Sequence, residues 1–130
     1  MNVKHLNIAV VCNGRRELNA AMFDIIEAEN SKGAIVQKYI KGQELRVMYP
    51  ELIVIFKAIL VGDYRNAHGM RYDGVLYETG SFYAREFALE VVECCTLKSK
   101  IAEAFHLMEI SQYLRSKHIY RCVKETSRWL

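Results

Sequence analysis

Several features that often identify the function of a protein are absent from this sequence. It has a single proline, Pro50, and no low-complexity tract, so nothing in it resembles a linker between domains. No apolar run approaches the roughly 18 to 20 residues that a membrane span needs. The apolar run 6–12 is too short for a convincing signal sequence. We therefore expect one cytoplasmic domain over residues 1–130, with no membrane partner.

The motifs of common enzyme classes are also missing. The sequence has no G-x-G-x-x-G, no Walker-type lysine loop and no nucleophile elbow. Its cysteines include no C-x-x-C pair, and each lies in an apolar segment, so we expect reduced, buried thiols at Cys12, Cys94, Cys95 and Cys122. These absences favour a non-enzymatic protein without cofactor or metal. Only a site assembled from distant residues is compatible with a catalytic role.

The composition and the order of local patterns predict a folded α+β domain. Hydrophobic residues make up 52% and charged residues 25% of the chain, which excludes a wholly disordered protein. We expect a small mixed or antiparallel sheet, made of the N-terminal strand plus one or two hairpins. Three to five helices pack on it, and the C-terminus is helical.

The first half of the predicted body, residues 1–96, follows from apolar periodicity. The run Lys4–Cys12 is apolar and partly β-branched, which predicts a strand buried on both faces. A helix follows over Glu17–Asn30. Ala34–Ile40 and Glu44–Tyr49 then predict two strands joined in a hairpin.

The second half of the body contains one ambiguous segment. Pro50 with an acidic neighbour favours a helix over residues 50–61, although the Ile-Val-Ile-Phe run within it is equally compatible with a strand. Asp73-Gly74 predicts a type I′ hairpin within the polar stretch 63–80. Ser81 is then the expected N-cap of a helix over Phe82–Cys95.

Residues 97–130 are predicted to form a basic helical tail that packs on the body. They contain no glycine or proline, and Thr96 is a suitable N-cap. The apolar stripe of the tail loses its phase beyond Met108, so we expect two helices with a break near 109–111. Residues 111–130 have five Lys or Arg against one acid, a net charge of +4, whereas residues 1–96 are near neutral with 11 basic and 12 acidic residues.

Two sets of residues are candidates for function. The first lies in the tail on one helix face, where it either contacts nucleic-acid phosphates or complements the helix dipole as a solvated surface: Arg115, Lys117, Arg121, Lys124 and Arg128. The second combines a strand-to-helix corner with the polar stretch, and suits either a phosphorylated ligand or a protein interface: Arg15, Arg16, Tyr64, Arg65, His68, Arg71, Tyr72 and Tyr77.

The leading functional prediction is a non-enzymatic regulatory protein that contacts nucleic acid, DNA or RNA, through its basic C-terminal helix. Two alternatives stay open. One is a protein–protein interaction or inhibitor protein, including a homo-oligomer of the viral or mobile-element accessory type. The other is a binder of a small phosphorylated ligand or nucleotide.

Overall fold

The computed structural model describes residues 4–68, 71–95 and 107–115. Its first strand, β1 (Lys4–Cys12), and first helix, α1 (Arg15–Ser31), have nearly the predicted bounds. β1 lies in the interior of the sheet, so apolar side chains on both of its faces, such as Ile8 and Ala9, are fully buried. α1 packs against one face of the sheet through an apolar stripe that includes Leu18 and Met22.

The predicted hairpin is confirmed as β2 (Ile35–Ile40) and β3 (Glu44–Tyr49), which pair antiparallel. Gly42 in its turn has a φ of 74°, a left-handed conformation that costs a glycine little. An irregularity in β2 between Val36 and Lys38 shifts the register there. β3 alternates inward-facing and outward-facing side chains, as expected for a strand with one fully covered face.

Residues 50–61 contain β4 (Leu52–Leu60), so the predicted helix there is wrong. β4 pairs antiparallel with β3 on one side and parallel with β1 on the other. In this interior position its long β-branched run fills both faces of the sheet, which outweighs the helix-start signal of Pro50. The turn between β3 and β4 holds Pro50 and Glu51, the latter with a φ of 65°.

The predicted Asp73-Gly74 hairpin is also wrong. A short helix, α2 (Tyr64–Ala67), is followed by β5 (Gly74–Tyr77), which pairs parallel with β1. Neither Asp73 nor Gly74 has the positive φ that a type I′ turn requires. Instead, the Asp73 backbone N–H donates to the Asn7 carbonyl (2.7 Å), so pairing with a strand 66 residues away overrides the local turn signal.

The helix after the polar stretch is confirmed as α3 (Phe82–Cys95), and the Ser81 hydroxyl accepts from the Ala84 N–H (3.2 Å) as predicted for a cap. Beyond it, β6 (Leu107–Glu109) pairs parallel with β5 and leads into α4 (Ile110–Arg115). The helical prediction is therefore wrong at 107–109, because the edge of β5 offers these residues a parallel partner. The other expected tail segments, 97–106 and 116–130, lie outside the described residues.

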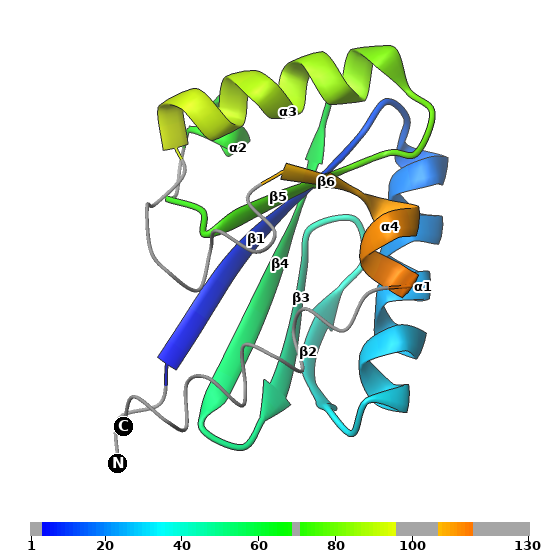
Figure 1. Ribbon diagram of the computed structural model, residues 1–130, viewed down its shortest axis with the longest axis vertical. Helices are drawn as coiled ribbons and strands as arrows, with labels where there is room; N and C mark the ends of the chain where they lie inside the picture. Colours follow the sequence, from blue (N-terminus) through cyan, green and yellow to red (C-terminus); the bar gives the residue numbers. More distant parts are fainter. Residues whose placement is uncertain (1–3, 69–70, 96–106, 116–130) are drawn as a thin grey trace.

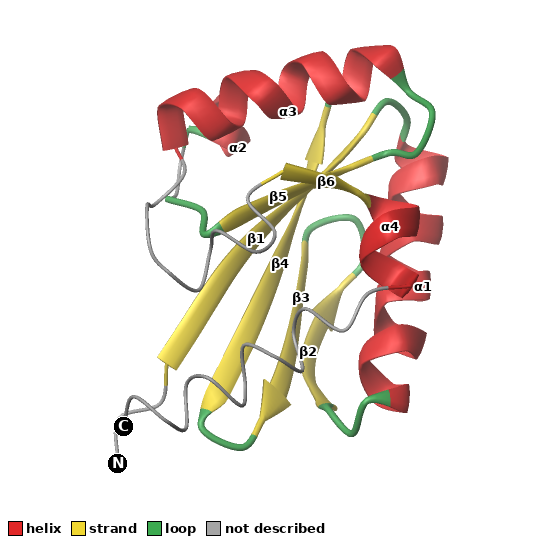
Figure 2. Ribbon diagram, viewed as in Figure 1, coloured by secondary structure: helices red, strands yellow, loops and turns green. Residues whose placement is uncertain are grey.

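In the described part of the chain the sheet has six strands in the order β2-β3-β4-β1-β5-β6. β4, β1, β5 and β6 run parallel, while β3 is antiparallel to both of its neighbours. α1 and α4 cover one face and α3 covers part of the other (Figure 1), giving a mixed α/β architecture (Figure 2). The expected mixed sheet with helices is confirmed, but the sheet is larger than predicted and mostly parallel.

Two apolar cores separate the layers. One lies between the sheet and α1 and includes Leu6, Val10 and Phe56; the other lies between the sheet and α3 and includes Ala9 and Val91. Cys12 is a free, buried cysteine, as predicted. None of the helices in the described ranges combines the length and the apolar character that a membrane span requires.

The core beneath α1 contains a fully buried carboxylate, Glu29. It accepts hydrogen bonds from the hydroxyls of Tyr49 on β3 and Tyr113 on α4, the latter at 2.7 Å, and Lys32 Nζ lies 3.7 Å from it. Burial, together with the neighbouring Glu29, raises the pKa of Tyr49, so its hydroxyl stays protonated as a donor. This buried cluster ties α1, β3 and α4 together.

Candidate functional site

A step in the sheet creates a recess where strands β1 and β4 end. The last residue pair between β3 and β4 is Glu44 with Lys57, yet β4 continues to Leu60. The end of β4 therefore projects beyond the β2–β3 hairpin and leaves a cavity of about 470 Å³ beside it. Carboxyl ends of parallel strands are a recurrent place for ligands in open α/β sheets, because loops and helix starts gather there.

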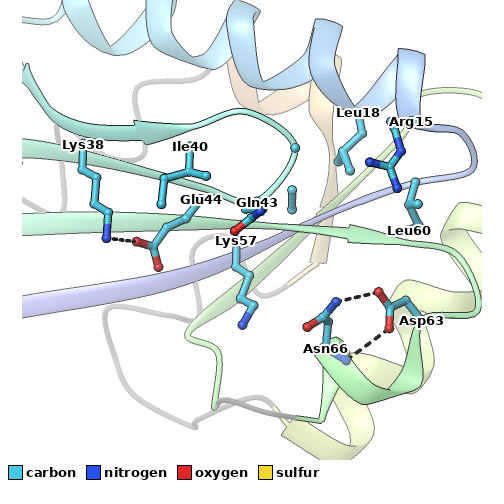
Figure 3. Close-up of a pocket in the computed structure, with 12 residues that line it drawn as sticks. Arg15, Leu18, Lys38, Ile40, Gln43, Glu44, Lys57, Leu60, Asp63 and Asn66 are labelled. Carbon is cyan, nitrogen blue, oxygen red and sulfur yellow. Dashed lines mark hydrogen bonds and ion pairs between the residues drawn. The ribbon is translucent and has the colours of Figure 1, made fainter.

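Four elements supply the walls of this recess. Arg15 and Leu18 enter from the first turns of α1, and the hairpin turn contributes backbone and side chains. Figure 3 shows Lys38 and Lys57 pointing away from α1, on the side of the sheet where Asp63 and Asn66 lie. The complete lining consists of Arg15, Leu18, Lys38, Ile40, Gly42, Gln43, Glu44, Lys57, Ala58, Leu60, Asp63 and Asn66.

The two acidic groups of the recess already have polar partners. Glu44 lies 3.6 Å from Lys38 Nζ and 3.2 Å from Arg46 Nε. The carboxylate of Asp63 accepts from the backbone N–H of Asn66 (3.3 Å) and from its side-chain amide (2.6 Å), which caps α2. Within residues 4–68, 71–95 and 107–115, by contrast, no ion pair forms at Arg15 or Lys57. The recess is therefore positively charged.

The N-terminus of α1 does not offer its positive dipole end to the recess, because an acidic side chain of the same helix lies over it. The carboxylate of Glu17 lies over Gly14, so closely that a Cβ atom at Gly14 would collide with Glu17 Oε2. This carboxylate occupies the position beside the helix terminus where an external anion would meet the first N–H groups. The positive charge of the recess that has no ion-pair partner among the described residues therefore comes from the side chains of Arg15 and Lys57, not from the helix terminus.

Cys12, at the end of β1, does not have the properties of a nucleophile. Its burial, followed by the negative charges of Glu78 and Glu17, raises the pKa of the thiol to about 12. A thiol with that pKa is protonated at neutral pH, whereas catalytic cysteines act as thiolates. Glu78 itself accepts a hydrogen bond from the Asn13 backbone N–H (3.0 Å) and so has a structural partner.

The structure brings together few of the residues that the sequence grouped as a ligand or partner site. Arg15 lines the recess, but its neighbour Arg16 does not. Tyr72 is fully buried in the core under α3, where its hydroxyl donates to the Asn66 carbonyl at 3.3 Å. Tyr77 is half-buried in β5, and Arg71 is exposed in the segment before it.

The remaining members of that group lie on or beside α2. Tyr64 and Arg65 belong to its single turn, which His68 follows. The Tyr64 ring packs edge-on against Phe87 of α3, with centroids 5.1 Å apart. A hydrogen bond with Glu90 raises the pKa of Tyr64, which places this hydroxyl at the α2–α3 contact rather than in the recess.

Of the predicted nucleic-acid contacts, Arg115 is exposed in the last turn of α4. The other four, Lys117, Arg121, Lys124 and Arg128, lie outside the described residues. Among the described residues, no group of three or more His, Cys, Asp or Glu side chains is placed so that it could hold a metal ion.

The sequence reasoning missed most of the recess: Lys38, Gln43, Glu44, Lys57, Asp63 and Asn66. One signal was present in the sequence. Lys57 interrupts the apolar run Leu52–Leu60, and a cation inside an otherwise buried strand indicates that one position of that strand faces solvent or a ligand.

No protein-family model matches the chain, and no curated protein sequence matches it. Its fold is similar to part of the large terminase from a thermophilic bacteriophage. One crystal form superimposes with a TM-score of 0.64 at 12% identity, covering 84% of this chain and 26% of the terminase. A crystal form in complex with ADP gives a TM-score of 0.59 at 12% identity, covering 84% and 25%. The chain thus spans about a quarter of that protein, and the likeness shows a shared fold.

Proposed function

We propose that the protein binds a phosphorylated ligand, such as a nucleotide, in the recess at the ends of β1 and β4. The observation that carries this proposal is that two cations, Arg15 on the α1 side of the sheet and Lys57 on the opposite side (Figure 3), line one cavity of about 470 Å³ without an ion-pair partner among the described residues. Phosphate oxygens suit such groups because charge-assisted hydrogen bonds are the strongest that side chains make.

Two further considerations support this proposal. The recess lies at the carboxyl ends of parallel strands, where α/β proteins commonly hold their ligands. In addition, the bacteriophage terminase, about a quarter of which has a similar fold, has been crystallised in complex with ADP. ADP is therefore a reasonable first probe, and inorganic phosphate tests whether the phosphate group alone is recognised.

The test is a titration of ADP into the full chain, in which isothermal titration calorimetry measures the dissociation constant. We expect Lys57→Gln and Arg15→Gln each to weaken binding by about tenfold or more, because a hydrogen bond to a charged group contributes about 1.5 to 3 kcal/mol. Arg16→Gln is the matched control, since Arg16 is adjacent to Arg15 but does not line the recess. Equal effects of Arg15→Gln and Arg16→Gln, or no binding of ADP or phosphate, would contradict the proposal.

A second candidate function is contact with nucleic acid through the basic tail. It is favoured by the concentration of charge in residues 111–130, with five basic residues against one acid. Binding should weaken steeply between about 50 and 200 mM salt, because each phosphate contact releases counterions. Charge reversal at Lys117, Arg121 and Lys124 should abolish this binding while leaving ADP binding intact. A protein partner is the alternative if neither nucleic acid nor nucleotide binds.

A further inference from the structure

The strands β2, β3 and β4 present a second polar surface on the face opposite α1, here called the outer face. Strand register defines its members, because directly paired residues point to the same side. Lys38 pairs with Arg46, and Glu44 pairs with Lys57. The distances from Glu44 to Lys38 and Arg46 agree with this placement. Figure 3 shows Lys38, Glu44 and Lys57 directed away from α1.

This surface is open in the part of the chain that the structure describes. α3 covers the same side of the sheet but packs against β5, β1 and β6, whereas α1 contacts β2 and β3 from the opposite side. The side chains of Lys38 and Arg46 are 48% and 37% exposed. Beside these cations runs an apolar row formed by the paired residues Ile35, Met48 and Ile53, in which Ile35 is 63% exposed.

The charge of the outer face identifies the chemistry of a partner. Lys38 and Arg46 pair with the same carboxylate, that of Glu44, and Lys57 lies opposite Glu44 in the strand register, so three cations accompany one acid and the surface is complementary to an anion. Lys38, Glu44 and Lys57 belong both to this face and to the lining of the recess, which makes the two surfaces continuous. Cross-strand neighbours on one face lie roughly 5 to 8 Å apart, so the cations form a track from β4 to β2 rather than a single point. A chain of regularly spaced anions fits such a track better than one compact anion does.

We propose that a single strand of nucleic acid crosses the outer face, with one phosphate in the recess at Lys57 and the next phosphates at Arg46 and Lys38. This inference rests on the proposed phosphate-binding function of the recess and names its ligand class. A flexible single strand can enter the recess and continue over the sheet, whereas a rigid duplex meets only the rim. The described outer-face positions carry no aromatic side chain for base stacking, so recognition is of the backbone and independent of sequence.

The experiment measures fluorescence anisotropy of a labelled single-stranded oligothymidine of about 12 nucleotides, within the usual site size of single-strand binders. All proteins carry Lys117→Gln, Arg121→Gln and Lys124→Gln, so that the tail cannot supply the binding. Arg46→Gln is compared with Arg85→Gln on α3. Arg85 is a matched control for Arg46, because each arginine pairs with a nearby glutamate: Arg46 with Glu44 at 3.2 Å and Arg85 with Glu86 at 3.5 Å.

We expect the oligonucleotide to bind and Arg46→Gln to weaken it, with the slope of log K against log salt reduced by about 0.7 for one lost phosphate contact. Between about 50 and 200 mM salt that slope change corresponds to roughly a 2.6-fold difference. Lys38→Gln should behave alike, whereas Arg85→Gln should match the parent. Glu44→Gln should tighten binding, because it frees both cations. If the ion pairs of Glu44 have only a structural role, Glu44→Gln should not increase the affinity for the oligonucleotide.

The outcomes separate this inference from the proposed function. One outcome is that ADP binds but the oligonucleotide binds no more tightly than ADP does. Another is that Arg46→Gln and Arg85→Gln have equal effects in folded proteins. In either case the outer face is not a nucleic-acid surface, and the recess proposal stands. If duplex of the same length binds as tightly as the single strand, the choice of a single strand is wrong. If neither ADP nor phosphate binds and Lys57→Gln has no effect on the oligonucleotide, both proposals fail.

Discussion

Two glutamates on opposite sides of β3 show how burial changes the role of the same chemical group. Glu29 is fully buried beneath α1 and accepts from Tyr49 and Tyr113, with Lys32 close by. Glu44 lies on the outer face, with a side chain that is 21% exposed. The neighbours of Glu29 are thus two neutral hydroxyls and one cation. The polar neighbours of Glu44 are all cations: Lys38, Arg46 and, opposite it in the strand register, Lys57.

This contrast separates the contacts that hold the fold together from those that are available to a ligand. When a buried acceptor is removed, its donors are left without a partner and cannot reach water. The free energy of unfolding therefore falls. Ion pairs near the surface contribute little to stability, because water and salt screen them and the long side chains lose freedom. The cations around Glu44 can therefore exchange this carboxylate for a phosphate at small cost to the fold.

The largest expected effect is the loss of the buried carboxylate. Glu29→Ala should destabilise the protein by about 3 kcal/mol, because two buried hydroxyls lose their acceptor and Lys32 loses its counter-charge. Glu44→Ala should cost less than about 1 kcal/mol. Urea denaturation followed by circular dichroism gives both values. Similar costs at the two positions would show that Glu29 and Glu44 do not differ in their contribution to folding.

A smaller effect is expected when the donors of the buried cluster are removed one at a time. Tyr49→Phe and Tyr113→Phe should each cost about 1 kcal/mol, since each deletes one hydrogen bond but leaves Glu29 with another donor. The double variant should cost more than the sum, because the carboxylate then keeps only Lys32. Additive costs in this double-mutant cycle would show that the two tyrosines do not act on a shared group.

Part of this architecture follows directly from the sequence. The β1 and α1 elements, the β2–β3 hairpin and α3 have local signatures: an apolar run, a helical stripe, a glycine turn and the Ser81 cap. β4 and β5 do not, because their identity depends on pairing with β1. Pro50 favoured a helix in a segment that was equally compatible with a strand, and Asp73-Gly74 favoured a hairpin. Strand pairing across the domain overrides both local signals.

The recess was harder to predict for the same reason. It arises because β4 extends beyond the last residue of its pairing with β3, and a difference in strand length is visible only when the register is known. Arg15 was identified from its place after the first strand. Lys57 and Asn66 were not identified. No local feature of the sequence indicates that a lysine in β4 and an asparagine hydrogen-bonded to Asp63 line the same cavity. The buried partnership of Glu29 with Tyr113, 84 residues apart, was equally invisible.

The smallest expected effect concerns a third carboxylate, Asp73, which is buried and forms no ion pair with a described cation. Its exposed fraction is 7%, and burial raises its pKa, an effect that the hydrogen bond from the Asn7 N–H (2.8 Å) partly opposes. A raised pKa in the folded state means that the folded protein binds the proton more tightly than the unfolded chain. The stability contribution of this group is therefore greatest at low pH and is lost as pH rises through the folded pKa.

Asp73→Asn removes this penalty, because asparagine is uncharged at every pH and its side-chain oxygen can still accept from Asn7. We expect the variant to be more stable than the parent at neutral pH, with an advantage that shrinks as the pH is lowered toward about 4. Urea unfolding from about pH 4 to 8 measures this difference, and Asp24→Asn, at an exposed position of α1, reports the effect of removing a surface carboxylate. An advantage for Asp73→Asn that is constant with pH would mean that Asp73 does not titrate differently in the folded and unfolded states. Its gain would then come from packing rather than from charge.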